Sequence, residues 1–182
     1  MVLYFTGTGN SRYIAERIAK ALDDELFSIN DRIKADSREA VDTGSRVVIV
    51  APTYAWRLPV IVSEWISETD FAGAEKIWFV MDCGSQIGNA AKYNRALSDR
   101  KNLQYMGTAQ IIMPENYIAM FPVPDSEEAA EIIANAEPDI DDVIARISAS
   151  QKFAKPRNNL LDRMMSGPVN RMFYPFCVKA RA

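Results

Sequence analysis

The sequence predicts an α/β protein with a doubly wound parallel sheet of five strands, in the spatial order 2-1-3-4-5, with helices on both faces and a C-terminal helical extension. Two observations carry this prediction. Short apolar runs alternate with amphipathic segments through residues 1–113, and the runs are apolar at almost every position. Strands buried on both faces have this composition, and crossover helices connect such strands.

Taken in order, the apolar runs predict strands at 2–5, 26–29, 47–51, 77–81 and 109–113. Apolar residues recur at helical spacing from Tyr13 to Leu22, over 58–67 and over 90–99, which predicts a helix in each segment. A further helix is expected from Ser126, which can cap it, to about residue 149, with a break or kink at Pro138. Residues 114–124 hold three prolines and several large apolar residues, which predicts an extended loop over the surface.

Charge divides the chain near residue 150. Residues 1–150 carry 14 Lys or Arg and 23 Asp or Glu, whereas residues 151–182 carry seven bases and one acid. We therefore expect a domain at 1–150 and a basic extension or linker at 151–182, which either packs on the acidic stretch 127–142 or offers a docking surface. The net charge of −3 argues against nucleic acid as a partner.

Composition restricts the chemistry. The 182 residues include no His and only two Cys, so Ser-His-Asp and Cys-His nucleophile systems and zinc or iron–sulfur sites within the chain are excluded. We assign neither a metal site nor a catalytic residue, and we expect the chemistry to come from a bound cofactor. No apolar run approaches the ~20 residues that span a bilayer, so we expect no membrane contact and a cytoplasmic protein.

The segment between the first strand and the first helix has the features of a phosphate loop. Its residues are Thr6, Gly7, Thr8, Gly9, Asn10 and Ser11. Backbone N–H groups at a helix N-terminus bind phosphate, and small polar side chains can add further donors. A Walker A motif would need a Lys after Gly9, and a G-x-G-x-x-G motif would need a third Gly where Arg12 stands.

Two later loops should meet this one, because ligands of doubly wound sheets bind at the carboxyl ends of the strands. The third strand leads into Pro52, Thr53, Tyr54, Ala55 and Trp56, and the fourth leads into Asp82, Cys83, Gly84 and Ser85. Tyr54 and Trp56 are candidates to stack on a ring system, and the polar loop with Gly84 can present backbone groups to a heterocycle.

These three loops resemble those of the flavodoxin superfamily, whose phosphate loop is close to [ST]-x-T-G-[NT]-[TS], over about residues 1–150. The resemblance implies that the protein binds FMN non-covalently. It implies that Thr6 to Ser11 hold the phosphate and that Cys83 to Ser85 contact the pyrimidine end. Tyr54 and Trp56 would cover a face of the ring, and Tyr54 matches the family position better. Pro114 to Tyr117 and the tail more closely resemble the EFR1-family ferredoxins, which adds Tyr117 as a cofactor contact and implies a ferredoxin-type iron–sulfur domain or another redox protein as partner. The cluster cysteines of that group are absent from this chain.

Three functions remain open from the sequence. The first is a flavin electron carrier. The second is a flavin-dependent NAD(P)H or quinone oxidoreductase, in which the loop with Tyr117, Met120 and Phe121 would cover a substrate pocket. The third is a non-redox module that binds a phosphate or nucleotide, against which the aromatic pair Tyr54 and Trp56 argues.

Overall fold

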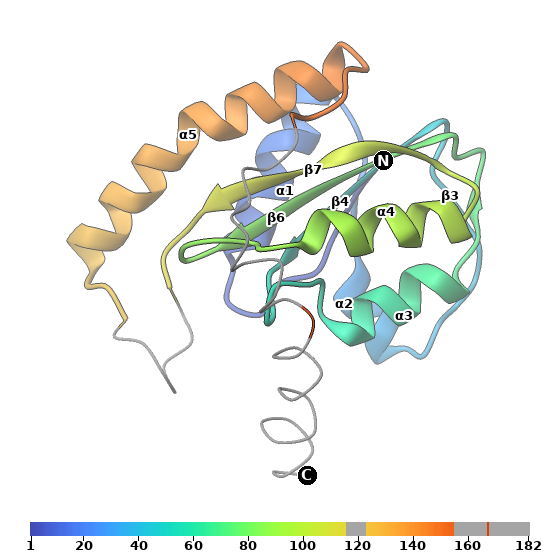
Figure 1. Ribbon diagram of the computed structural model, residues 1–182, viewed down its shortest axis with the longest axis horizontal. Coiled ribbons are helices and arrows are strands. Elements are labelled where there is room, and N and C mark those ends of the chain that lie inside the picture. Colours follow the sequence, from blue (N-terminus) through green and yellow to red (C-terminus); the bar gives the residue numbers. More distant parts are fainter. Residues whose placement is uncertain (116–122, 155–166, 168–182) are drawn as a thin grey trace, which may run out of the picture.

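A parallel sheet of five strands forms the centre of the molecule (Figure 1). The computed structural model describes residues 1–115, 123–154 and 167. The strands are β1 (Val2–Tyr4), β2 (Leu26–Ser28), β4 (Arg46–Pro52), β6 (Lys76–Cys83) and β7 (Gln104–Ile112). Their order in space is β2-β1-β4-β6-β7, and every neighbouring pair is parallel. Counted along the chain this is the order 2-1-3-4-5, so the predicted topology is confirmed.

Helices cover both faces of the sheet. They are α1 (Asn10–Leu22), α2 (Ile29–Lys34), α3 (Val60–Glu68), α4 (Ala90–Arg100) and α5 (Ser126–Ser148). Helices α1 and α5 lie together on one face, and α2, α3 and α4 lie on the other (Figure 1). The three layers bring the carboxyl ends of the strands and the loops that follow them to one end of the molecule.

Alternate residues of each strand enter different halves of the core. Leu3 and Phe79 pack with Trp65 of α3 on one face. Val2 and Trp78 pack with residues of α1 and α5 on the other face. Because both faces are covered, every position of β4 and β6 between their end residues is buried, which explains why the strand sequences are apolar at almost every position.

Three short elements were not predicted from the sequence. Helix α2 follows β2 directly and has only six residues, with the Ser28 hydroxyl accepting a hydrogen bond from the Asp31 N–H. Strands β3 (Val41–Asp42) and β5 (Phe71–Ala72) form a separate parallel pair. Elements of two to six residues are too short to show a hydrophobic period, so pattern alone does not reveal them.

Helix α5 differs from the prediction in two details. It runs through Pro138 without interruption, so no break occurs there, and the alternative of a kink stays a prediction. Its N-cap is Asp125, whose carboxylate accepts hydrogen bonds from the N–H groups of Glu127 and Glu128, each at 2.9 Å, so Ser126 is the first helical residue and not the cap. Buried residues on both sides of the proline, among them Ala136 and Ile140, hold the two halves against the sheet.

The chain after α5 crosses strand β7. The Trp78 indole N–H donates to the carbonyl of Gln151 at 2.9 Å, and the Phe153 N–H donates to the carbonyl of Met106 at 2.8 Å. At Gly107, in a bulge of β7, φ is 123°, and a Cβ built there would be 2.7 Å from the Cβ of Phe153. A glycine is therefore required where the chain passes over the sheet.

Two expectations concern parts of the chain beyond this crossing. The packing of the basic tail on residues 127–142 lies outside the described residues, and the domain boundary at residue 150 stays a prediction. Within the described part of the chain, no helix combines the length and the apolar character needed to cross a bilayer.

Candidate functional site

The loop after β1 is held in place by a side chain from helix α2. Asn30 bonds the backbone of Thr6 twice: its Oδ1 accepts from the Thr6 N–H and its Nδ2 donates to the Thr6 carbonyl, both at 2.9 Å. The Thr6 hydroxyl oxygen in turn accepts from the Gly9 N–H at 3.0 Å. The turn from β1 into α1 is therefore fixed by the protein itself.

The N-terminus of α1 presents unused backbone donors at this loop. Gly9 is the N-cap residue, with φ at 115°, and no side chain caps the helix. The N–H groups of Asn10, Ser11 and Arg12 donate no hydrogen bond to any residue that the structure describes. A Cβ built on Gly9 would have no atom within 4 Å, so the loop is open on that side. Free N–H donors at the positive end of a helix dipole favour an anion.

The side chains of Asn10 and Ser11 point away from the loop into protein contacts. The Asn10 amide donates to the Pro114 carbonyl at 3.0 Å, which ties the start of α1 to the segment after β7. The Ser11 hydroxyl donates to the carboxylate of Asp82 at the end of β6. Ser11 and Asp82 are 1% and 4% exposed. The contribution of these two residues at the loop is therefore their backbone N–H groups.

Asp82 is a carboxyl group with almost no access to water. Burial raises its pKa to about 6, because the charged form loses its hydration, and the hydrogen bond from Ser11 opposes the rise. The carbonyl of the same residue accepts from the Thr53 N–H at 2.9 Å. Asp82 thus contacts both the start of α1 and the loop after β4.

The loop after β4 makes a tight turn that presents two aromatic rings. Tyr54 and Arg57 exchange backbone hydrogen bonds of 2.9 and 3.2 Å, and the residues between them, Ala55 and Trp56, have φ of 47° and 62°. Turns of this kind favour Asn and Gly, so Trp56 is held in a strained conformation. The Arg57 guanidinium lies 3.6 Å from the centre of the Tyr93 ring, which anchors the turn on α4.

Tyr54 reaches from this turn to the loop after β1. It is 41% exposed, and its hydroxyl would be 3.4 Å from a Cβ built on Gly7. Beside it, the hydroxyl oxygen of Thr53 is buried and has no hydrogen-bond partner among the described residues. A buried hydroxyl without a partner is a cost to the folded state that a bound polar ligand can remove.

The loop after β6 is braced from strand β7. The side-chain amide of Gln110 donates to the Ser85 carbonyl and accepts from the Ile87 N–H, both at 3.1 Å. The Cys83 carbonyl accepts from the Met113 N–H at 2.9 Å. A Cβ built on Gly84 would overlap the carboxylate of Glu115, so a larger residue at this position would displace that side chain.

Cys83 is not a reactive thiol in this environment. Burial raises its pKa to about 12, and the neighbouring carboxylates of Asp82 and Glu115 add to the rise. The nucleophilic form of cysteine is the thiolate, which is negligible at neutral pH under these conditions.

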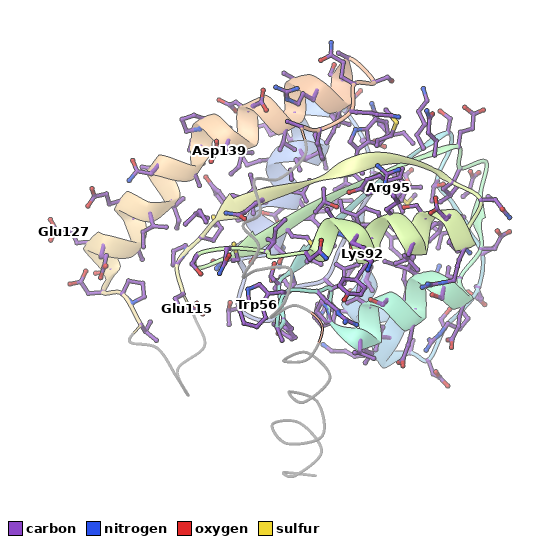
Figure 2. All side chains as sticks on the ribbon, viewed as in Figure 1. Trp56, Lys92, Arg95, Glu115, Glu127 and Asp139 are labelled. Atoms are coloured by element: carbon purple, nitrogen blue, oxygen red, sulfur yellow. The ribbon has the colours of Figure 1, made fainter. Side chains whose placement is uncertain are left out.

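The structure brings together the three loops expected to form the site. Four contacts connect them to one another and to the segment after β7: Tyr54 with Gly7, Ser11 with Asp82, Asn10 with Pro114, and Glu115 with Gly84. Trp56 and Glu115 both lie at the end of the sheet where the strands finish (Figure 2). Thr8 is exposed on the loop, Pro52 is the last residue of β4, and Tyr117 lies outside the described residues.

Four residues that support the site were not found from the sequence. Asn30, Gln110, Pro114 and Glu115 lie 24 or more residues away in sequence from the loop residues that they contact. Asn30 and Gln110 are common residue types at a helix start and in a strand, and no motif marks them. Pro114 and Glu115 belong to the segment that resembles the EFR1-family ferredoxins, but the resemblance did not assign them to the site.

The comparisons with known proteins agree with this architecture. The family model described as a flavodoxin domain matches residues 1–110. No curated protein matches the chain by sequence. The chain therefore belongs to the flavodoxin domain family, which confirms the predicted resemblance at the level of the superfamily.

Solved structures share the fold at low sequence identity. A flavo di-iron protein from Thermotoga maritima is 12% identical with a TM-score of 0.50, and the match covers 82% of this chain and 35% of that one. An FMN-dependent NADH-azoreductase from Bacillus anthracis, in complex with FMN, is 11% identical with a TM-score of 0.49 over 81% and 98% of the two chains. A flavodoxin from Megasphaera elsdenii is 15% identical with a TM-score of 0.45 over 77% and 97%. At these identities the first likeness shows a common fold and nothing about activity.

Proposed function

We propose that the protein binds FMN non-covalently and transfers electrons. The observation that supports the proposal best is the N-terminus of α1, which no side chain caps and which lies at the carboxyl end of the sheet. The chain that contains it belongs to the flavodoxin domain family. The unused N–H donors of α1 suit the phosphate of a mononucleotide. When bound, FMN supplies the transfer of one or two electrons, and the protein supplies binding and electrostatics.

The residues present fit the group. The phosphate would be held by the loop at residues 6–11 and the first N–H groups of α1, and the approach is open at Gly9, where a built Cβ has no atom within 4 Å. The Thr53 hydroxyl, which is buried and has no hydrogen-bond partner among the described residues, would offer the cofactor a polar contact. Tyr54, already directed at Gly7 and 41% exposed, would cover one face of the ring, and the backbone at Cys83 to Ser85 would bond its polar edge.

A direct titration tests this proposal. We expect the purified protein to bind FMN with quenching of the flavin fluorescence, and to bind it more tightly than riboflavin, which lacks the phosphate. Replacing both Tyr54 and Trp56 by Ala should weaken FMN binding about tenfold or more, because each aromatic contact contributes roughly 0.5–1.5 kcal/mol beyond its buried area.

A matched control removes apolar surface without touching the site. Val60 and Ile61 on α3 are 39% and 45% exposed, and replacing both by Ala should leave FMN affinity unchanged. If the Tyr54/Trp56 variant and this control bind equally well, the aromatic turn is not a flavin contact. That result would favour the non-redox alternative, in which only a phosphate is recognised.

We further propose a ferredoxin-type iron–sulfur protein as the electron partner, on the strength of the sequence resemblance to the EFR1-family ferredoxins. The test is the rate of electron transfer between the flavin-loaded protein and a reduced ferredoxin. Steady-state oxidation of NADPH with a quinone acceptor, without any partner, would instead indicate the oxidoreductase alternative.

A further inference from the structure

Asp82 lies directly behind the phosphate loop, connected to it by one residue. Ser11 is the second residue of α1, so its N–H is among the unused donors of the helix N-terminus, while its hydroxyl donates to the Asp82 carboxylate. The front of the loop is open, whereas Asp82 on the other side is only 4% exposed. An anion in the loop and the charge of Asp82 would therefore face the same helix end from its two sides.

No positive charge lies between these two positions among the described residues. On α1, Arg12 pairs with Glu16, and Tyr13 donates to Glu137 of α5. The register neighbours of Asp82 in β4 and β7 are Pro52 and Ile111, which do not titrate. Other titratable groups at this end, within the described part of the chain, are Cys83, whose thiol stays protonated, and Glu115, an acid beside Gly84. The Tyr54 hydroxyl faces Gly7, and the Arg57 guanidinium of the same turn lies on the ring of Tyr93.

The helix dipole alone favours the charged form of Asp82, but a bound phosphate would compete for the same dipole. A phosphate monoester carries close to two negative charges above its second pKa of about 6. In a site of low dielectric constant, two anions that face one helix end repel each other strongly. Protonation of Asp82 removes the repulsion and keeps its hydrogen bond with Ser11.

We propose that Asp82, acting through Ser11, is a proton-linked positioning residue: it takes up a proton when a phosphate monoester binds at residues 6–11, so that FMN affinity depends on pH. The inference rests on the proposed function, since it concerns the same site. The pKa of about 6 in the free protein sets the range in which the proton must be acquired. Above that range the carboxylate is charged before the ligand arrives, and binding is weakened.

The experiment measures the FMN dissociation constant from pH 6.5 to 8.5, where most of the FMN phosphate is doubly ionised. We expect the constant to rise roughly tenfold over this range, and calorimetry in two buffers of different ionisation enthalpy should show uptake of about half a proton per FMN at pH 7.5. Riboflavin should show no such dependence. In Asp82→Asn the dependence and the proton uptake should disappear, and FMN should bind about thirtyfold more tightly than in the wild type at pH 8.

Two further variants keep the test decisive. Asp36→Asn removes the same charge from a carboxylate whose side chain is 96% exposed, and its pH profile should match the wild type. Ser11→Ala retains Asp82 but removes the hydrogen bond that lowers its pKa, so the pH dependence should move to higher pH. This second variant replaces Asp82→Asn if that protein does not fold.

The possible outcomes separate this inference from the proposed function. FMN binding that is independent of pH in the wild type, or proton uptake that persists in Asp82→Asn, overturns the role of Asp82 and leaves FMN binding intact. Failure to bind FMN at every pH overturns both.

Discussion

Because the carboxyl group of Asp82 is buried, the stability of the ligand-free protein should depend on pH. Its pKa is raised in the folded state, from the ordinary 3.8 to about 6, because burial penalises the carboxylate. Between these values the folded state binds more protons than the unfolded state does. The free energy of unfolding therefore falls as the pH rises through this window, by about 3 kcal/mol for a shift of two units.

We expect Asp82→Asn to abolish this loss. The measurement is urea unfolding of both proteins at pH 4 and pH 7.5, where the difference between wild type and variant should change by about 3 kcal/mol in favour of the variant at the higher pH. Subtracting one protein from the other cancels the other carboxyl groups. Parallel stability profiles would show that Asp82 does not titrate in this range.

At the residue scale, the sequence predicts the loop residues of the site better than it predicts the side chains that hold these loops in place. Thr6 to Ser11 follow a local pattern whose residue types are imposed by the turn and the helix N-terminus. Asn30 and Gln110 hold the same site together, but each is an amide side chain that acts over a long sequence separation. The direction of the Ser11 hydroxyl, toward Asp82, is likewise decided by packing of α1 on β6.

At the scale of elements, the capping of α5 gives a direct contrast between two adjacent residues. Asp125 accepts two backbone hydrogen bonds at the start of the helix, whereas Ser126 is already helical. Asp125→Ala should lower the free energy of unfolding by about 1 kcal/mol, since two N–H groups lose their acceptor and the helix dipole loses a favourable charge.

Ser126→Ala is the matched control, and we expect it to change stability by less than about 0.5 kcal/mol. Chemical denaturation monitored by circular dichroism measures both variants. Equal losses in the two variants would mean that Ser126 shares the capping role that the sequence suggested for it.

The regular elements could be predicted wherever burial imposes a repeating pattern. All five strands of the main sheet and the helices α1, α3, α4 and α5 overlap segments that the pattern indicates, although β7 begins at Gln104, before the predicted start at residue 109. Strands β3 and β5 are too short for a pattern to appear. The helix break expected at Pro138 does not occur, because the tertiary contacts of α5 outweigh the local cost of a proline in a helix.

At the scale of the whole molecule, net charge should govern how FMN binding responds to salt. Residues 1–150 carry a net charge of −9, and no Lys or Arg precedes Arg12. A doubly charged phosphate thus approaches an acidic domain at a loop whose donors are backbone N–H groups. Raising the salt from 0.01 to 0.2 M shortens the screening length from about 30 Å to under 10 Å and weakens the repulsion.

We therefore expect FMN affinity to increase with salt, by about threefold to tenfold over this range, while riboflavin affinity stays constant. Fluorescence titrations of both ligands at each salt concentration measure the effect. A decrease in FMN affinity with salt would instead indicate a lysine or arginine in contact with the phosphate.

The order of the strands could be predicted because parallel strands joined by crossover helices allow few arrangements. The same rule places the loops after β1, β4 and β6 at one end of the sheet. The contacts of Gly7 with Tyr54 and of Asp82 with Thr53 and Ser11 follow from that placement.

The crossing of the chain over β7 also bears on how the protein behaves in a crowded solution. β7 is an edge strand of nine residues, and a long, flat edge can recruit a strand from another molecule and start aggregation. Here the bulge at Gly107 twists the edge, and the Phe153 N–H already occupies the Met106 carbonyl. The segment after α5 that crosses β7 thus also prevents another molecule from adding a strand to the sheet at this point.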